Sequence, residues 1–200
     1  MLTRKAKIVS PRKFQIFEEN LPELVENQVL LKVLSCGICS SELPVYLGDV
    51  IGTPGVSFRY KDYPADFGHE VVGEVLEIGL AVKNINVGSI VTGLTYSGCG
   101  FSTYFIEDAD VLIEIPETGA EESIYALGEP LMATVNILNQ MSVEFGANVV
   151  IIGDGFMSLL LIAALGRYPL GSLIVVGHHN DRLKLAEKYG ENPEVCNAIG

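Results

Sequence analysis

One short stretch of the sequence concentrates reactive side chains. Residues 36–42 read Cys-Gly-Ile-Cys-Ser-Ser-Glu, so two thiols, two hydroxyls and a carboxylate fall within one turn. A thiolate is a strong ligand for zinc, and a neighbouring hydroxyl can pass a proton to or from an oxygen bound to a metal. One cysteine does not make a metal site, so further ligands must come from elsewhere in the chain.

Two later stretches supply such ligands, a Gly-His-Glu sequence at 68–70 and a Gly-Glu-Pro sequence at 128–130. The candidate metal ligands are therefore Cys39, His69, Glu70 and Glu129. Thiolate, imidazole and carboxylate together suit zinc and leave room for water or a substrate oxygen. Structural roles stay open for two of them, because Glu129 can be an acid at a helix start and Glu70 a charge at a strand edge.

The spacing of Cys36 and Cys39 also fits a redox-active CxxC pair. Such a motif would have to coexist with the zinc-like set, so we interpret Cys36 as a small buried hydrophobic residue at a strand end. Four cysteines in 200 residues do not indicate a secreted disulfide framework. No signal peptide is evident at the start of the sequence, and a reducing cytoplasm is the expected location.

Composition excludes several classes of function. With 48% hydrophobic residues the chain can bury a core, and Lys+Arg 13 against Asp+Glu 25 gives a net charge of −12. Nucleic acid and anionic membranes are poor partners for such a charge. The apolar run 157–165 is too short to span a bilayer.

Alternating apolar residues and glycine turns predict a β-rich first part, a small barrel or sandwich ending near Pro116. The expected strands are 6–10, 13–18, 28–34, 71–79, 87–92, 100–106 and 111–116. The segment 49–63 is a long loop, which we interpret as the rim of a substrate pocket or as a surface excursion. Residues 120–141 predict a helix that links two halves of the chain.

The second half begins with a pattern typical of dinucleotide binding. An apolar strand from Asn148 runs into Gly153-Asp-Gly155-Phe-Met-Ser158 and then an apolar helix at 159–165. Two glycines permit a tight turn and a close approach of a pyrophosphate to the helix N-terminus. Ser158 replaces the usual third glycine or alanine, which weakens the motif.

A second apolar strand, 172–176, is followed by Gly177 and His178 where an NAD enzyme usually carries an acid for the ribose. Losing that carboxylate would remove repulsion against a 2′-phosphate, which His178, His179 or Arg182 could face. This pattern slightly favours NADP over NAD. In the alternative interpretation, Asp181 caps the 182–189 helix and the histidines belong to a solvated loop.

These motifs, in this order, resemble the zinc-containing medium-chain alcohol dehydrogenases, particularly the sorbitol, threonine and glucose dehydrogenase-like branch. The resemblance implies an α/β plus β fold, with a GroES-like β-rich catalytic domain followed by the start of a Rossmann nucleotide-binding domain. The expected boundaries are 1–118 for the catalytic domain, 119–146 for a linking helical segment and 147–200 for a partial Rossmann domain.

The resemblance also assigns roles. It implies that Cys39, rather than Cys36, and His69 are zinc ligands, and that Glu70 and Glu129 are the remaining ligand positions. Ser41 matches the hydroxyl that relays the substrate proton, and Glu42 matches a carboxylate behind the site. The implied cofactor-binding residues are Gly153, Gly155, Ser158, Gly177 and His178.

The implied enzyme is a zinc-dependent NAD(P) oxidoreductase that transfers a hydride between an alcohol or polyol and the nicotinamide. Its cofactors would be one catalytic Zn²⁺ and NAD or NADP. Many family members also hold a structural zinc with four closely spaced cysteines. In this sequence the corresponding segment, 92–99, contains only Cys99, so no structural zinc is expected. A small-molecule alcohol or carbonyl substrate and a homo-oligomeric full-length protein are also implied. Two alternatives remain, a non-catalytic nucleotide- or partner-binding relative and a zinc-free quinone reductase-like enzyme.

Two departures from the family pattern affect these expectations. Pro44 occupies a position where many members carry a histidine, so any proton relay beyond Ser41 must differ or use water. Only two strands of a doubly wound sheet, which normally has six, are recognisable before Gly200. We therefore expect the sequence to be part of a longer chain, because half a sheet would expose a long apolar edge.

Overall fold

The computed structural model describes residues 1–49, 62–116, 121–190 and 193–198. The chain divides into two compact units, Met1–Glu129 and Pro130–Gly200. The domain boundaries expected at residues 118 and 146 stay predictions.

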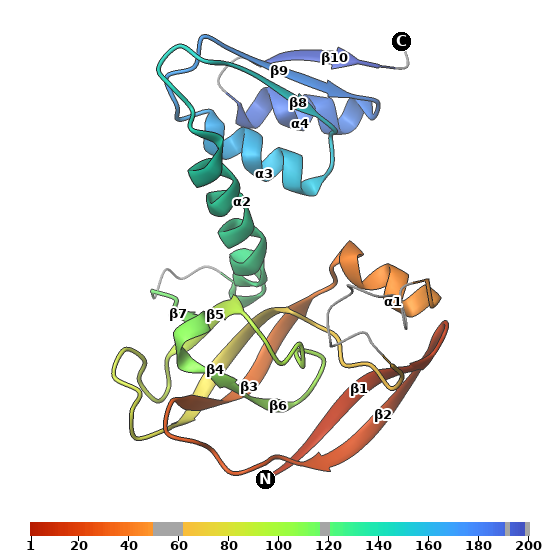
Figure 1. Cartoon of the computed structure of the whole chain (residues 1–200), viewed down its shortest axis with the longest axis vertical. Helices are drawn as coiled ribbons and strands as arrows, with labels where there is room; N and C mark the ends of the chain where they lie inside the picture. The colour runs from red at the N-terminus through yellow and green to blue at the C-terminus, as the bar shows by residue number, and fades with distance from the viewer. Residues whose placement is uncertain (50–61, 117–120, 191–192, 199–200) are drawn as a thin grey trace. The chain divides into compact units, whose positions relative to one another are not determined.

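A five-stranded antiparallel sheet in the order β6-β3-β4-β5-β7 forms the centre of the first unit (Figure 1). Its strands are β3 (Gln28–Gly37), β4 (Glu70–Ile78), β5 (Ile90–Leu94), β6 (Tyr104–Asp108) and β7 (Leu112–Glu114). The first four residues of β4 are all buried, as expected of a central strand that is covered on both faces. The core around this sheet includes Leu31, Val75, Val91 and Phe105.

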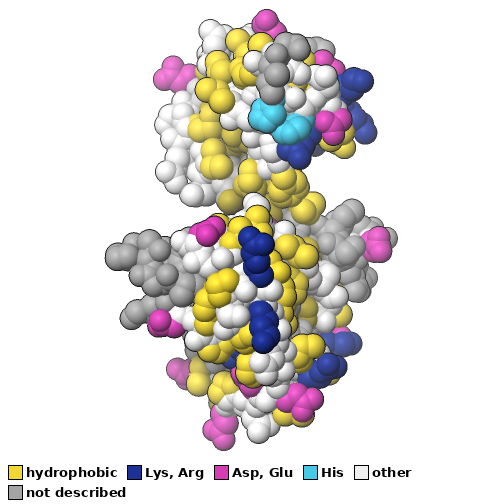
Figure 2. All heavy atoms as spheres, turned by 90° about the vertical axis from the view of Figure 1, so that its right-hand side faces the viewer, with side chains coloured by type: hydrophobic (Ala, Val, Ile, Leu, Met, Phe, Trp, Pro, Cys, Tyr) yellow, Lys and Arg dark blue, Asp and Glu magenta, His cyan; other side chains and the backbone are white. Residues whose placement is uncertain are grey.

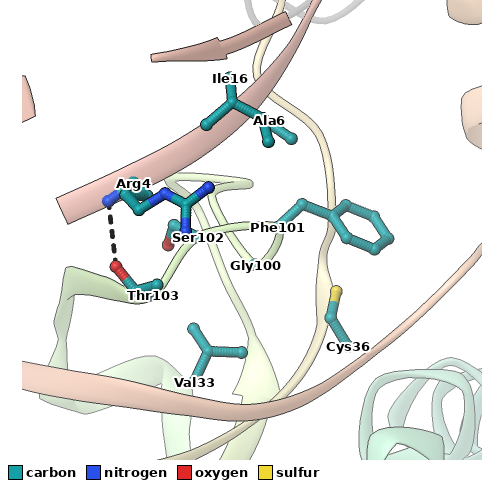
Figure 3. A pocket seen from close by; sticks show the side chains of 9 residues that line it. All are labelled: Arg4, Ala6, Ile16, Val33, Cys36, Gly100, Phe101, Ser102 and Thr103. Atoms are coloured by element: carbon teal, nitrogen blue, oxygen red, sulfur yellow. Dashed lines mark hydrogen bonds between the residues drawn. The ribbon is translucent and has the colours of Figure 1, made fainter. Parts of the chain in front are cut away.

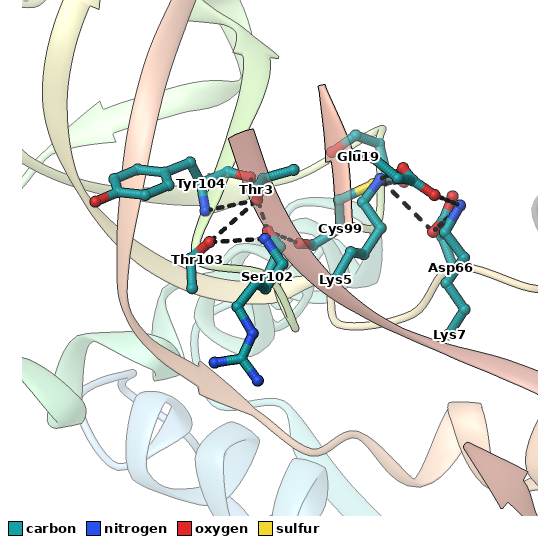
Figure 4. A network of polar contacts seen from close by, with 11 residues as sticks. Thr3, Lys5, Lys7, Glu19, Asp66, Cys99, Ser102, Thr103 and Tyr104 are labelled. Atoms are coloured by element: carbon teal, nitrogen blue, oxygen red, sulfur yellow. Dashed lines mark hydrogen bonds and ion pairs between the residues drawn. The ribbon is translucent and has the colours of Figure 1, made fainter. Parts of the chain in front are cut away.

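A hairpin of β1 (Leu2–Ser10) and β2 (Lys13–Asn20) packs beside the sheet. Thr3 Oγ1 donates a hydrogen bond to the Tyr104 carbonyl at 2.7 Å and accepts the Tyr104 N–H at 3.1 Å. Figure 4 shows this contact and a neighbouring ionic group, in which Lys7 lies 2.6 Å from Glu19 and 3.7 Å from Asp66. The hairpin is therefore fixed to the sheet by side-chain bonds as well as by apolar packing.

Short helical segments carry the chain out of the sheet. A 3-10 turn, η1 (Ser40–Glu42), and helix α1 (Leu43–Leu47) follow β3, with Pro44 in the first turn of α1. A further 3-10 turn, η3 (Ala109–Val111), separates β6 from β7. The 3-10 segment η4 (Glu122–Leu127) then leads into helix α2 (Gly128–Met141), which begins in the first unit and continues into the second.

The second unit is a three-stranded parallel sheet in the order β10-β9-β8. It consists of β8 (Asn148–Ile152), α3 (Phe156–Leu165), β9 (Ser172–Gly177), α4 (Asn180–Tyr189) and β10 (Glu194–Asn197). Ile162 and Leu165 of α3 and Ala186 of α4 are fully buried in its core. This strand–helix alternation is the beginning of a Rossmann domain, which confirms the predicted fold class.

The structure corrects several element boundaries. The strand expected at 87–92 begins at Ile90, and the one expected at 100–106 begins at Tyr104, because turns occupy the preceding residues. The second half has a third strand, β10, that the sequence pattern did not reveal. Most of the predicted 49–63 loop, residues 50–61, lies outside the described residues. Among the described helices, none combines the length and apolarity needed to cross a bilayer.

Candidate functional site

The candidate metal centre forms at one end of the pairing between β3 and β4. Gly37, the last residue of β3, pairs with Glu70, the first residue of β4. A Cβ atom at position 37 would overlap the Glu70 carboxylate, so glycine leaves the space that this buried side chain occupies. The strand register therefore places Glu70 beside the turn that carries Cys39.

The side chains of Cys39, His69 and Glu70 come together there. One potential ligand atom from each lies within 4.8 Å of the others, and Cys39 and His69 are half-buried. The structure thus brings together three of the four metal ligands proposed from the sequence. Ser41, the proposed proton relay, lies next to them in η1, and its Oγ donates to Cys39 Sγ at 3.2 Å.

Glu42 fixes the orientation of His69. Glu42 Oε1 accepts the Gly68 N–H at 2.5 Å and lies 3.0 Å from His69 Nδ1, with a side chain only 6% exposed. A carboxylate partner on Nδ1 favours a proton on that nitrogen and leaves the Nε2 lone pair available to a metal. Gly68 has φ +94° and packs on Phe101, so a side chain at position 68 would disturb this arrangement.

Glu129, in the first turn of α2, approaches the same centre. Thr92 Oγ1 on β5 donates to the Tyr125 carbonyl at 3.0 Å and to the Val71 carbonyl at 2.8 Å, which holds the end of η4 against the sheet. Gly128 packs directly on Thr92, where a Cβ would lie 2.5 Å from it. Glu129 lies outside the 4.8 Å cluster of the other three ligands but within electrostatic reach of His69 and Glu70.

The centre concentrates negative charge. The hydrogen bond that His69 donates to Glu42 raises the pKa of His69 against the opposing effect of burial, and the charges of Glu42, Glu129 and Glu70 add to it. Burial raises the pKa of Glu129, and the neighbouring Glu70 charge raises it further while His69 opposes this. Several carboxylates around one imidazole and one thiol are an environment that a bound cation would stabilise.

Cys36 takes no part in this cluster. Its thiol lies below Phe101 in a separate cavity of about 370 Å³ that Val33 and Arg4 also line (Figure 3). Burial and the charges of Glu42 and Glu70 raise the pKa of Cys36 to about 12, so it remains a thiol at neutral pH. All four cysteines are free, so Cys36 and Cys39 form no disulfide in this structure.

A larger cavity adjoins the cluster on the hairpin side. It measures about 530 Å³, and Cys39 and Glu42 line it together with mainly apolar residues of β1, β2 and the aromatic cluster. The aromatic cluster is Phe14, Tyr46, Phe67 and Phe101, with successive ring centroids 4.4–5.1 Å apart. The turn that carries the candidate ligand Cys39 is therefore bordered by apolar surface.

The donor set fits zinc. A thiolate, an imidazole with a free Nε2 and a buried carboxylate supply soft and borderline ligands, and Glu129 lies near enough to contribute charge. The carboxylate behind His69 is the kind of outer partner that orients metal-binding histidines. Cys39, His69 and Glu70 can therefore hold a zinc ion, with Glu42 as their support.

In the second unit, the glycine-rich turn connects β8 to α3. Gly153 has φ +121°, which favours glycine, and Gly155 is the N-cap residue of α3 with open space where a Cβ would stand. Ser158 lies in the first turn of α3, and its Oγ would be 3.4 Å from a Cβ at Gly153. These three proposed cofactor residues lie in one half-buried turn at a helix N-terminus, which suits a phosphate.

Sequence reasoning missed one residue at this turn, Asp154. Its buried carboxylate accepts the N–H groups of His178 at 2.9 Å and His179 at 2.6 Å, and lies 3.0 Å from His179 Nδ1. Gly177 packs against the same carboxylate, with a hypothetical Cβ only 2.6 Å from Oδ2. Gly177 could have indicated this arrangement from the sequence. A glycine at the packed end of a strand leaves a space, which another group then fills.

Asp154 corrects two expectations. The sequence indicated that no carboxylate would stand near the end of the second strand, whereas the glycine-rich turn supplies one. His179 and Arg182, expected to face a 2′-phosphate, face Asp154 at 3.0 Å and 4.0 Å. The alternative in which Asp181 caps the helix is also wrong, because α4 begins at Asn180 and His179 takes the N-cap position.

Comparisons with known proteins agree with this architecture. Residues 25–129 match the family described as the alcohol dehydrogenase GroES-like domain. Sorbitol dehydrogenase of Halalkalibacterium halodurans is 30% identical over 206 aligned positions, which cover 88% of this chain and 57% of that protein. (R,R)-Butanediol dehydrogenase of Bacillus subtilis is 29% identical, with 84% of this chain and 56% of that protein covered.

A solved structure shows the same likeness in three dimensions. The crystal structure of 2R,3R-butanediol dehydrogenase from Bacillus subtilis matches with a TM-score of 0.81 and 25% identity, over 98% of this chain and 63% of that one. The chain spans a little more than half the length of the curated relatives it matches. Since the matched domain alone covers more than half of the 200 residues, the chain belongs to the alcohol dehydrogenase GroES-like domain family, within the zinc-containing medium-chain alcohol dehydrogenases.

Proposed function

We propose that this protein is a zinc-dependent oxidoreductase that transfers a hydride between an alcohol or polyol and NAD(P). The observation that carries the proposal is the convergence of Cys39, His69 and Glu70 with His69 held by Glu42. The sorbitol and butanediol dehydrogenases that it resembles are named for alcohol substrates, which supports a small alcohol or its carbonyl product as the substrate class.

In this proposal Cys39, His69 and Glu70 hold the zinc ion, and Glu129 adds negative charge beside them. When bound, zinc supplies a Lewis acid that acidifies an alcohol hydroxyl and polarises a carbonyl. Glu42 leaves His69 Nε2 free to bind the metal by accepting the hydrogen on Nδ1. The half-buried position of Cys39 and the apolar cavity beside it limit the water that competes with a substrate at this turn.

Ser41 moves the proton. Its Oγ lies 3.2 Å from Cys39 Sγ, so the hydroxyl is close enough to the ligand turn to accept the proton that an alcohol releases on oxidation. Ser41 is exposed, and Pro44 of α1 has no side-chain group that could take the proton further. The proton therefore passes from Ser41 Oγ to solvent water. The Gly153–Ser158 turn binds the pyrophosphate of the dinucleotide through backbone N–H groups at the start of α3.

The decisive experiment measures zinc and nucleotide binding by the purified chain. Elemental analysis after zinc-replete expression should give one zinc per chain, and titration should show binding of NADH or NADPH. Cys39→Ala should lose the zinc, whereas Cys196→Ala, which removes an exposed thiol of the second unit, should retain it. Stoichiometric zinc in folded Cys39→Ala would contradict the proposed ligand set.

Other outcomes separate the remaining candidates. No zinc in the wild-type chain would favour a zinc-free reductase, and zinc binding without nucleotide binding would contradict the assigned nucleotide site. Alcohol-dependent reduction of a nicotinamide by the purified chain would exclude a non-catalytic relative.

A further inference from the structure

The end of β9 is occupied by an anion that belongs to the protein. Asp154 Oδ2 accepts both backbone N–H groups that follow the strand, those of His178 and His179. The carboxylate is 4% exposed, and Gly177 provides the space for it. Asp154 and Gly177 are thus a complementary pair, because any side chain at position 177 would collide with the carboxylate.

The surrounding charges disfavour a cation here, although Asp154, His178 and His179 bring potential metal ligands together. Arg182 Nη1 lies 4.0 Å from Asp154 Oδ1, and the N-terminal end of α4, which carries a partial positive charge, begins at Asn180. Both features repel a metal ion. His179 Nδ1 lies near both oxygens of the carboxylate, at 3.0 Å and 3.2 Å.

We infer that Asp154 selects NAD(H) against NADP(H), acting from the glycine-rich turn in place of an acid at the end of β9. This inference rests on the proposed function, since it concerns the cofactor of that enzyme. In Rossmann domains the end of the second strand faces the ribose of the adenosine, where NADP carries its extra phosphate. At that point the chain places a buried negative charge directly behind Gly177.

The donors that a 2′-phosphate would need are already engaged. The two backbone N–H groups after β9 bind Asp154, and the charged groups of His179 and Arg182 face the same carboxylate. A dianionic phosphate would have to compete with Asp154 for these partners and approach its charge. A ribose hydroxyl carries no charge and meets neither obstacle.

His178 and His179 form the outer boundary of this position. Both side chains are exposed, and their rings lie 4.3 Å apart. Figure 2 shows histidine side chains on the surface of the second unit with both basic and acidic side chains beside them. The solvent-facing groups therefore carry both signs of charge, and the buried carboxylate beneath them adds a negative charge at the end of β9.

The test compares NADH with NADPH, and ADP-ribose with its 2′-phosphate, by calorimetric titration of the full chain. The adenosine-side fragments isolate this position from the nicotinamide end. The wild-type chain should bind NADH and ADP-ribose at least about tenfold more tightly than the phosphorylated counterparts, since like charges oppose the latter. Asp154→Asn, which keeps the side-chain shape and removes the charge, should bring this ratio close to one.

Asp181→Asn is the matched control, because it removes the same charge from an exposed residue in the first turn of α4. It should leave most of the ratio intact. Circular dichroism establishes that each variant is folded before its affinities are compared. The zinc content of Asp154→Asn should equal that of the wild type, since the metal ligands lie in the other unit.

The outcomes distinguish this inference from the proposed function. NADPH binding as tight as NADH binding in the wild type, or an unchanged ratio in folded Asp154→Asn, would overturn the role of Asp154 and leave the dehydrogenase assignment intact. Binding of neither nucleotide would overturn the nucleotide site itself, and this inference with it.

Discussion

The two units each contain a histidine held by a buried carboxylate, and the two pairs are closely similar in local geometry. In the first unit Glu42 accepts the N–H of Gly68 and lies 3.0 Å from His69 Nδ1. In the second, Asp154 accepts the N–H groups of His178 and His179 and lies 3.0 Å from His179 Nδ1. In both pairs a carboxylate from one turn fixes the backbone and the ring of another segment.

What differs is the surroundings of the imidazole. His69 is 11% exposed and faces Cys39 and Glu70, so the far side of its ring meets groups that bind a cation. The His179 side chain is 44% exposed, and its carboxylate also faces Arg182 near the start of α4. The comparison teaches that a histidine–carboxylate pair does not define a function by itself. In the two proposals made above, the charges around the pair decide whether it orients a metal ligand or fixes a charge beside a nucleotide.

Removing the first carboxylate should have the largest effect. Glu42→Ala leaves the Gly68 N–H without its acceptor and His69 without its orienting partner. We expect zinc affinity to fall about 10–100-fold and the free energy of unfolding to fall by roughly 1–3 kcal/mol. Competition with a fluorescent chelator and chemical denaturation measure the two effects.

Glu74→Ala is the control for this change, because Glu74 pairs with Lys32 at 3.4 Å on the surface of the same sheet. Its effect on unfolding should stay below about 1 kcal/mol, with unchanged zinc affinity. Equal effects of the two substitutions on zinc binding would show that Glu42 does not orient His69 for binding the metal.

The second pair can be tested through its fit to β9. Gly177→Ala places a Cβ about 2.6 Å from the Asp154 carboxylate, and we expect a loss of roughly 1–3 kcal/mol in the free energy of unfolding from overpacking. Gly155→Ala in the neighbouring turn meets no atom within 4 Å and should cost much less.

A double-mutant cycle sharpens this result. Adding Asp154→Gly to Gly177→Ala should recover part of the loss, because the collision partner is gone. If the two substitutions were simply additive, the complementary packing of these residues would be disproved.

The smallest expected effect concerns pH. The pKa of Asp154 lies well below its usual range, although burial opposes this shift. The main causes are hydrogen bonds from the His179 backbone and side chain, followed by the His178 backbone N–H and the charge of His179. A depressed carboxyl pKa stabilises the fold above the unfolded value, near 4, and this contribution is lost as pH falls toward the native value. The Tm difference between wild type and Asp154→Asn should therefore shrink as the pH falls from about 6 to about 3. A difference that stays constant over that range would contradict this charge-based stabilisation.

Much of the fold was predictable because its signals are local. Alternating residues of β4, the apolar strands β8 and β9 and the glycine-rich turn each follow a periodicity or turn rule that the sequence displays directly. The third strand, β10, was missed because Glu194–Asn197 is short and only partly apolar. The residues 122–127 were expected within a single helix but form a 3-10 segment held by Thr92 through tertiary contacts.

The ligand cluster and the position of Asp154 illustrate two different limits. Cys39 and His69 stand in motifs that resemble a family, so their residue types alone suggested a metal ligand set. The placement of Asp154 depends on Gly177, which is distant in sequence, and on backbone N–H groups that no motif displays. An absent side chain at position 177 indicated where a group was missing, but not which residue would fill the space.

The central place of β4 in its sheet has a consequence for how a metal ion would reach the candidate centre. Glu70 pairs with Gly37 on one side and with Leu94 on the other, so the donor atoms converge only after distant parts of the chain have formed the sheet. In small zinc modules the ion drives folding, but here the sheet must assemble first, and such non-local pairing is slow. We therefore expect newly made chains to mature through a folded, metal-free intermediate, and a chelator to remove the ion while leaving the β-sheet intact.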